Sequence, residues 1–232
     1  MTHYLNSKTM KLHAIIFDLD GVLADSEPMW NEIDGALLKH YGVEYSGQYK
    51  HEVLGKSFAL SLAFYQEKFG LRTDLEEMAL RRRDIAQTFY AQHIPVFDST
   101  VGVLQNLSTR GLPIGLATSS ISELVIPFLE RHDIKKFFTH ITTGEEVING
   151  KPAPDIYLRA AEKLQIAPEN CLVVEDALAG IQAGKSAGMK VAAIPDPRFM
   201  DVSLYPGKAD FILNDLGELP DLVERILKTM ES

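Results

Sequence analysis

Short apolar runs and amphipathic segments alternate along most of the chain. The runs are rich in Ile, Leu and Val, as is typical of parallel strands buried on both faces. Strands are expected at 13–20, 113–117, 138–142, 171–174, 191–194 and 210–213. Apolar spacing between the runs predicts helices at 99–110, 121–132, 154–164, 177–187 and 219–228. This alternation predicts an α/β fold with a doubly wound, Rossmann-like parallel sheet.

One long stretch near the N-terminal end has helical periodicity and no convincing strand. Ile33, Leu37 and Tyr41 recur at steps of four within 29–41, and the apolar residues of 57–69 are similarly spaced. Thr73-Asp74-Leu75-Glu76 matches a capping box that would begin a third helix. The stretch therefore predicts a small helical insertion between the first strand and the next helix. We expect a Rossmann-like core of residues 1–24 and 96–232 and a helical domain of residues 25–95.

Two carboxylates follow the first apolar run. Asp18 and Asp20 are separated by one residue and are followed by Gly21. In open parallel sheets, ligands bind beyond the carboxyl ends of the strands. Acids roughly 5 Å apart repel by about 3 kcal/mol at an effective dielectric near 20, unless a cation or a proton intervenes. A simple turn is the alternative interpretation, because Asp and Gly are common in turns.

Three further strand ends carry polar groups of complementary chemistry. Thr118-Ser119-Ser120 precedes a helix, where we expect Ser120 to cap the helix and the Thr118 hydroxyl to remain free for a phosphate. Lys151 lies in a loop stiffened by prolines, and Glu175-Asp176 follows another apolar run, although Asp176 could equally cap the next helix. Together these groups suit Mg²⁺ and a phosphate, and a carboxylate can act as the nucleophile in phosphoryl transfer.

The combination resembles the haloacid dehalogenase superfamily of aspartyl-phosphate hydrolases. The matching motifs, spread over residues 13–194, are Asp18-Leu19-Asp20-Gly21-Val22, Thr118 after an apolar strand, Lys151-Pro152-Ala153-Pro154-Asp155, and Glu175-Asp176 followed by Ala179-Gly180. The resemblance implies that Asp18 attacks phosphorus and that Asp20 acts as general acid and then as general base. It also implies that Thr118, Ser119 and Lys151 bind the phosphate. Mg²⁺ would be held by Asp18, Glu175, Asp176 and the backbone carbonyl of Asp20.

The helical insertion resembles the cap that closes over the site in this superfamily and selects the substrate. Within the superfamily, the sequence is most similar to the β-phosphoglucomutase and 2-deoxyglucose-6-phosphatase group, with a further likeness to pseudouridine-5′-phosphatases. The mutases carry a histidine and an arginine where this chain has Trp30 and Phe58, which disfavours mutase activity. Candidates for contact with the substrate are Ser26, Trp30, Lys56 and the run Arg81-Arg82-Arg83, and we expect the cap to move on hinges near 25–26 and 94–96.

Composition narrows the possible roles. A net charge of −9 disfavours a nucleic-acid binder, because such proteins need clustered positive charge. The N-terminal residues lack the apolar region of a signal peptide and no run is long enough for a membrane span, so we expect a cytoplasmic protein. The single cysteine, Cys171, lies in a predicted strand and is expected to be an inert core residue.

The sequence thus predicts a Mg²⁺-dependent phosphatase, either monomeric or weakly dimeric, that acts on a small phosphorylated metabolite, with a sugar phosphate as the first candidate. Two alternatives stay open. A phosphosugar mutase would pass the same intermediate to a sugar hydroxyl, and a catalytically silent sensor would bind the metabolite without turning it over.

Overall fold

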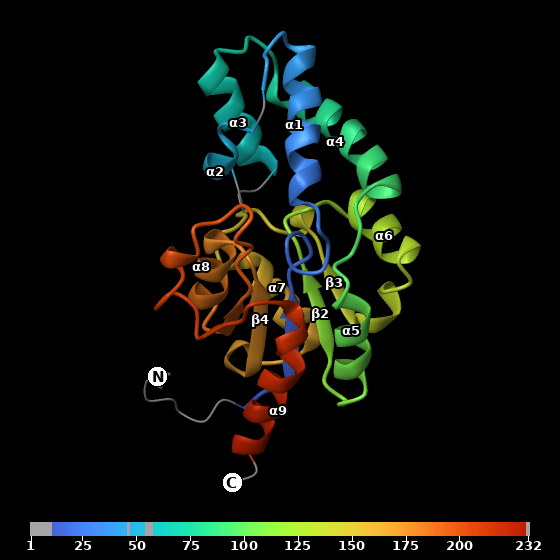
Figure 1. The fold of residues 1–232 in the computed structure, drawn as a ribbon, viewed down its shortest axis with the longest axis vertical. Helices are drawn as coiled ribbons and strands as arrows, with labels where there is room; N and C mark the ends of the chain where they lie inside the picture. Colours follow the sequence, from blue (N-terminus) through green and yellow to red (C-terminus); the bar gives the residue numbers. More distant parts are fainter. Residues whose placement is uncertain (1–10, 46, 54–57, 231–232) are drawn as a thin grey trace.

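Six parallel strands form the centre of the molecule (Figure 1). The structure is a computed structural model and describes residues 11–45, 47–53 and 58–230. The strand order is β3-β2-β1-β4-β5-β6, which confirms the doubly wound sheet. The chain runs from β1 to one edge of the sheet and then crosses back to β4, so β1 and β4 flank the point where the order reverses. The strands are β1 (Ala14–Phe17), β2 (Ile114–Ala117), β3 (His140–Thr142), β4 (Cys171–Glu175), β5 (Lys190–Ala193) and β6 (Phe211–Ile212).

Helices cover both faces of the sheet, because successive residues of each strand point to opposite sides. Ile15 and Phe17 of β1 pack with α5, α6 and α9, whereas Ala14 and Ile16 pack with α7 and α8. None of the helices in the described part of the chain combines the length and apolar character that a membrane span requires. The helices of the core are α5 (Thr100–Ser108), α6 (Ser122–Arg131), α7 (Asp155–Leu164), α8 (Leu178–Ser186) and α9 (Leu219–Met230).

A group of helices lies beyond one end of the sheet (Figure 1). It has its own apolar centre, in which Leu37, Leu38, Leu62, Tyr65 and Met78 are buried. The short helix α2 is not predicted by the apolar periodicity, since a single turn is too short to show one. The helices are α1 (Glu27–His40), α2 (Lys50–Val53), α3 (Phe58–Phe69) and α4 (Leu75–Gln92).

Two adjacent connections join this helical group to the sheet. Ala24 and Val96 form an antiparallel bridge, and the amide of Asp25 donates to the carbonyl of Pro95 at 3.0 Å. The guanidinium of Arg198, from the segment after β5, contacts both carboxylate oxygens of Asp25 at 2.7 and 3.1 Å. The predicted division into two domains, with hinges at these connections, remains a prediction.

One predicted helix cap is wrong by a residue. The helix α4 begins after Asp74, whose side chain accepts a hydrogen bond from the amide of Glu76 at 3.0 Å. The hydroxyl of Thr73 instead contacts the side chain of Glu77. Asp caps helices as well as Thr does, so the motif alone did not distinguish the two neighbours.

Candidate active site

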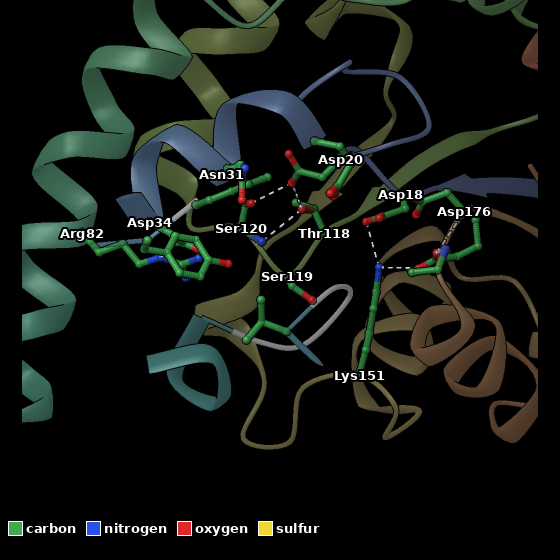
Figure 2. A pocket seen from close by; sticks show the side chains of 16 residues that line it. Asp18, Asp20, Asn31, Asp34, Arg82, Thr118, Ser119, Ser120, Lys151 and Asp176 are labelled. Atoms are coloured by element: carbon green, nitrogen blue, oxygen red, sulfur yellow. Dashed lines mark hydrogen bonds and ion pairs between the residues drawn. The ribbon is translucent and has the colours of Figure 1, made fainter. Parts of the chain in front are cut away.

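A pocket lies between the carboxyl ends of β1, β2 and β4 and the helices α1 and α4 (Figure 2). Its position agrees with the rule that ligands bind beyond the strand ends where the strand order reverses. The residues predicted from the four strand ends all line it, namely Asp18, Asp20, Thr118, Ser119, Lys151, Glu175 and Asp176. The sheet therefore brings together groups that are far apart in the sequence.

Lys151 connects two of the carboxylates. Its Nζ lies 2.8 Å from Asp18 Oδ1 and 2.7 Å from Glu175 Oε1, and all three side chains are buried. Burial alone would lower the pKa of Lys151, but the two carboxylates raise it, so the ammonium stays charged. Burial raises the pKa of Asp18 to about 8, against the lowering effect of Lys151 and with further raising by Glu175 and Asp20. The lysine is thus a fixed positive charge beside the predicted nucleophile.

Replacing Lys151 with Met should lower the free energy of unfolding by about 3–5 kcal/mol, because two buried carboxylates lose their shared partner. Chemical denaturation in EDTA would measure this. Lys136→Met is the matched control, since Lys136 pairs with Asp133 on the exposed surface and its loss should cost less than about 1 kcal/mol. Equal stability of the two variants would contradict the importance of the buried pair.

Glu175 is held by four hydrogen bonds. Its Oε1 accepts from Lys151 and from the hydroxyl of Tyr157 at 2.8 Å, and its Oε2 accepts from the amides of Asp176 and Ala177 at 2.9 and 3.0 Å. Gly180 makes room for this arrangement, because a Cβ there would lie 1.6 Å from Glu175 Oε1. Glu175 therefore has little free capacity for another partner in this structure.

Asp176 approaches the turn after β1 closely. A Cβ at Gly21 would lie 2.0 Å from Asp176 Oδ2, and Gly21 also has a φ of +79°, so this position requires glycine on two counts. Asp176 does not cap the following helix, because α8 begins after Ala177 without a side-chain cap. Burial, followed by the charges of nearby carboxylates, raises the pKa of Asp176 well above its usual range.

The residues present fit a metal ion. Oxygens of Asp18, Glu175 and Asp176 lie within 4.8 Å of one another, and the three carboxylates are buried with one lysine between them. The excess of buried negative charge would be relieved by a divalent cation. Asp18 and Asp176 are the better placed ligands, since both oxygens of Glu175 are engaged by donors.

Asp20 is turned toward the helical group rather than toward Lys151 (Figure 2). Its Oδ1 accepts a hydrogen bond from the hydroxyl of Tyr90 on α4, and its Oδ2 accepts from the hydroxyl of Ser120 at 2.8 Å. Burial and the charge of Asp20 raise the pKa of Tyr90 well above 10, so the phenol remains a donor. A side chain of the helical group thus holds the predicted acid.

The predicted roles of Ser120 and Thr118 need correction. Ser120 does not cap α6, which begins after Ile121 without a side-chain cap, because its hydroxyl donates to Asp20. The first turn of α6 is satisfied from elsewhere, since Glu145 accepts from the amide of Ser122 at 2.8 Å. The Thr118 hydroxyl lines the pocket but is not free, because it accepts from the amide of Ser120 at 3.0 Å and donates to Asp20 Oδ2 at 3.5 Å.

The candidates for substrate contact differ in position. Trp30 lines the pocket, and the guanidinium of Arg82 lies 4.8 Å from the centre of a Trp30 ring. Of the arginine run, Arg82 is the member among the pocket residues, and it is buried and paired with Asp34 at 2.7 Å, whereas Arg83 pairs with Glu123. Ser26 is buried but is not among the lining residues, and Lys56 lies outside the described residues. The Phe58 side chain lies outside the described part of the structure as well, so the contrast with the mutases at this position stays a prediction.

Several pocket residues were missed from the sequence. Asn31 and Asp34 line the pocket from α1, and Tyr90 on α4 donates to Asp20, but the apolar periodicity identified these helices and not their polar positions. Tyr157 is buried and donates to Glu175, a contact that no sequence pattern indicated. The one available signal for a pocket residue was a polar side chain on the apolar face of a helix. Asp34, which follows Asn31 by one turn, is such a side chain. Cys171 is confirmed as a buried core residue, and burial raises its pKa to about 12.

A doubly wound sheet with a buried acidic cluster at its carboxyl edge is the architecture of an α/β enzyme. The family pattern of haloacid dehalogenase-like hydrolases matches residues 15–194, and the chain belongs to that family. The match begins in β1 and ends just after β5, so it includes all four strand ends of the site.

Two relatives are phosphatases by description. A phosphorylated carbohydrates phosphatase from Thermotoga maritima is 30% identical over 179 residues, which cover 77% of this chain and 83% of the relative. A protein from Drosophila melanogaster described as a probable pseudouridine-5′-phosphatase is 33% identical over 199 residues, covering 83% and 86% of the two chains. The crystal structure of a β-phosphoglucomutase from Clostridium difficile has the same fold, with a TM-score of 0.80 at 23% identity over 95% of this chain and all of that one.

Proposed function

We propose that this hydrolase is a Mg²⁺-dependent phosphatase that removes phosphate from a small phosphorylated metabolite, with a sugar phosphate as the first candidate. The reaction would pass through a phosphate bound covalently to Asp18. The observation that carries the proposal is the position of Lys151, whose Nζ contacts both Asp18 and Glu175 in a pocket that Asp20 and Thr118 also line. A charged lysine beside a buried carboxylate nucleophile suits an anionic substrate.

In the first step, an oxygen of Asp18 attacks phosphorus and the bond to the leaving oxygen breaks. The Lys151 ammonium would hold a phosphate oxygen beside Asp18, and the side chains of Thr118 and Ser119 would bind the phosphate from the β2 side of the pocket. The buried position of Asp18 excludes bulk water from the attacking atom. Water would then attack the phosphorus of the intermediate, releasing phosphate and restoring the Asp18 carboxylate.

Asp20 would supply a proton to the leaving oxygen and later accept a proton from the attacking water. In this structure both of its oxygens accept hydrogen bonds, from Tyr90 and Ser120. Because Tyr90 is on α4, a shift of the helical group would change the position of the acid. We therefore propose that residues 25–95 act as a cap whose closure decides when Asp20 faces the substrate.

The proposed metal ligands are Asp18, Asp176, the backbone carbonyl of Asp20 and, after loss of one present hydrogen bond, Glu175. The metal supplies positive charge that offsets the phosphate and the acidic cluster. EDTA should therefore abolish turnover of p-nitrophenyl phosphate, and added Mg²⁺ should restore it. An unchanged rate in EDTA, after dialysis to remove resident metal, would contradict the metal assignment.

A mutase is the second candidate, and the likeness to β-phosphoglucomutase supports it at the level of the fold. The two activities differ in product from β-glucose 1-phosphate, since a phosphatase releases inorganic phosphate and a mutase forms glucose 6-phosphate. A panel of phosphorylated metabolites, scored by kcat/KM with Mg²⁺ present, would test the proposed phosphatase. Any turnover would also exclude the silent sensor. The cytoplasmic location and the monomeric or weakly dimeric state remain predictions.

A further inference from the structure

The beginning of α1 presents a row of polar side chains to the pocket. Glu27, Asn31 and Asp34 lie four and three residues apart, so they share one face of the helix, and all three line the pocket. Figure 2 shows Asn31 and Asp34 on the side of the pocket away from Lys151. If Lys151 holds the phosphate, this row faces the part of the substrate that leaves.

Asp34 is already saturated by protein groups. Its Oδ1 accepts from Arg82 Nε at 2.7 Å, and its Oδ2 accepts from the hydroxyl of Tyr65 at 2.6 Å. The pair is buried, and the guanidinium also lies against the ring of Trp30. Asp34 therefore fixes Arg82 in place on this side of the pocket. A substrate hydroxyl would have to displace an existing hydrogen bond to reach Asp34.

Asn31 differs from Asp34 because its side-chain oxygen has no hydrogen-bond partner among the described residues. Asn31 Oδ1 is buried, and none of the described residues donates a hydrogen bond to it. A buried acceptor without a donor is costly and rare, so each case needs an explanation. Gly47 packs closely against the side-chain amide of Asn31, because a Cβ at Gly47 would lie 2.4 Å from Asn31 Nδ2. The amide is thus packed in place with an unmatched acceptor.

The charged side chains that line the pocket disfavour a second anionic group on the substrate. Among the lining residues that the structure describes, the two cations, Lys151 and Arg82, are both paired with carboxylates. The remaining charged groups of this described lining are acidic. They are Asp18, Asp20, Glu27, Asp34, Glu175 and Asp176.

We infer that Asn31 Oδ1 accepts a hydrogen bond from a hydroxyl of the leaving group, so that Asn31 selects neutral, hydroxylated phosphate monoesters. This inference rests on the proposed phosphatase function and deepens it. A hydroxyl donor satisfies the buried acceptor, whereas an alkyl group in the same place leaves it unsatisfied. Discrimination of this kind exceeds what apolar contact provides, because the unmatched polar group penalises the wrong substrate.

The test compares wild type, Asn31→Leu and the control Glu32→Leu, which changes the next residue of α1 on its exposed side. Three probes are used with every variant: glycerol 3-phosphate, propyl phosphate, which has the same carbon chain without hydroxyls, and p-nitrophenyl phosphate. Phosphoglycolate, which carries a second anion, is also tested on wild type. Wild type should prefer glycerol 3-phosphate to propyl phosphate, and Asn31→Leu should lose about tenfold of that preference, as expected for one hydrogen bond. Turnover of p-nitrophenyl phosphate should be unchanged in Glu32→Leu, and in Asn31→Leu it serves as the reference rate to which the two alkyl esters are normalised. Leu is close to Asn in shape and removes the unmatched acceptor, so the melting temperature of Asn31→Leu should equal or exceed that of wild type.

Each other result overturns the inference. An unchanged preference in Asn31→Leu would show that Asn31 does not recognise the hydroxyl. An equal loss of activity on all three probes, with a lowered melting temperature, would assign Asn31 a structural role. A wild-type preference for propyl phosphate, or for phosphoglycolate with its second anion, would contradict the substrate class. Failure of wild type on every ester, p-nitrophenyl phosphate included, would reject the phosphatase function itself and the inference with it.

Discussion

Asp18→Asn should abolish phosphatase activity, with a loss of about 10³-fold or more, because the amide cannot attack phosphorus. Asn preserves the shape of the buried side chain and can keep an oxygen near Lys151, so the fold should be retained. Initial rates with p-nitrophenyl phosphate and Mg²⁺ would measure the loss, and circular dichroism would verify the fold.

Asp84→Asn is the matched control for this substitution. Asp84 is exposed on α4 and lies outside the pocket lining, so the same chemical change there should leave the rate near that of wild type. Substantial phosphatase activity in Asp18→Asn would contradict the assignment of Asp18 as nucleophile, whatever the behaviour of the control.

Asp20→Asn should slow the release of an alcohol leaving group by about 10²- to 10⁴-fold, the usual contribution of a general acid. A sugar alkoxide needs a proton to leave, whereas p-nitrophenolate is stable without one. The phosphorylation step should therefore fall much less with p-nitrophenyl phosphate than with a sugar phosphate. Hydrolysis of the intermediate should be slow with both substrates, because the same residue then serves as the base.

Stopped-flow measurement separates these steps, since a rapid release of p-nitrophenol should precede slow turnover in Asp20→Asn. Equal losses of the phosphorylation step for both leaving groups would argue that Asp20 acts through structure rather than through its proton. Tyr90→Phe is a useful variant to compare with Asp20→Asn, because it removes the hydrogen bond to Asp20 Oδ1 and leaves the carboxylate in place.

The sheet could be predicted from the sequence because its signals are local. Each buried strand is a continuous apolar run, and the runs of β1, β2 and β4 are followed directly by polar groups that line the pocket. Asp18, Lys151 and Asp176 then converge as a consequence of parallel topology, which places all carboxyl ends at one edge. Gly21 and Gly180 follow the same logic, since each leaves room for a neighbouring carboxylate.

The opposite wall of the pocket could not be predicted, because it depends on how helices pack. Arg82 and Asp34 are 48 residues apart, and Tyr90 and Asp20 are 70 apart, with no strand pairing to bring either pair together. The expectation for Ser120 was wrong for a related reason. A capping motif reports only nearby partners, and here a distant carboxylate, Asp20, competes successfully for the hydroxyl.

The two carboxylates after β1 have different surroundings, and this supports different roles. Asp18 is buried beside Lys151, whereas Asp20 is turned toward donors from α4 and from the end of β2. The mutual repulsion of the two acids suggested a metal shared by both side chains. In the structure, the argument for a metal holds only for the carboxylates of Asp18 and its neighbours Glu175 and Asp176. The Asp20 side chain remains available for proton transfer.

The most direct test of this account is to trap the covalent intermediate. Wild-type enzyme, mixed with a turned-over phosphate ester and Mg²⁺, would be quenched in acid within its first turnover and reduced with borohydride, which converts an aspartyl phosphate to homoserine. Mass spectrometry of the peptide that contains Asp18 should show homoserine at that position, and the Asp18→Asn variant should show none. Turnover without any modification of Asp18, or modification at another carboxylate, would contradict the proposed mechanism.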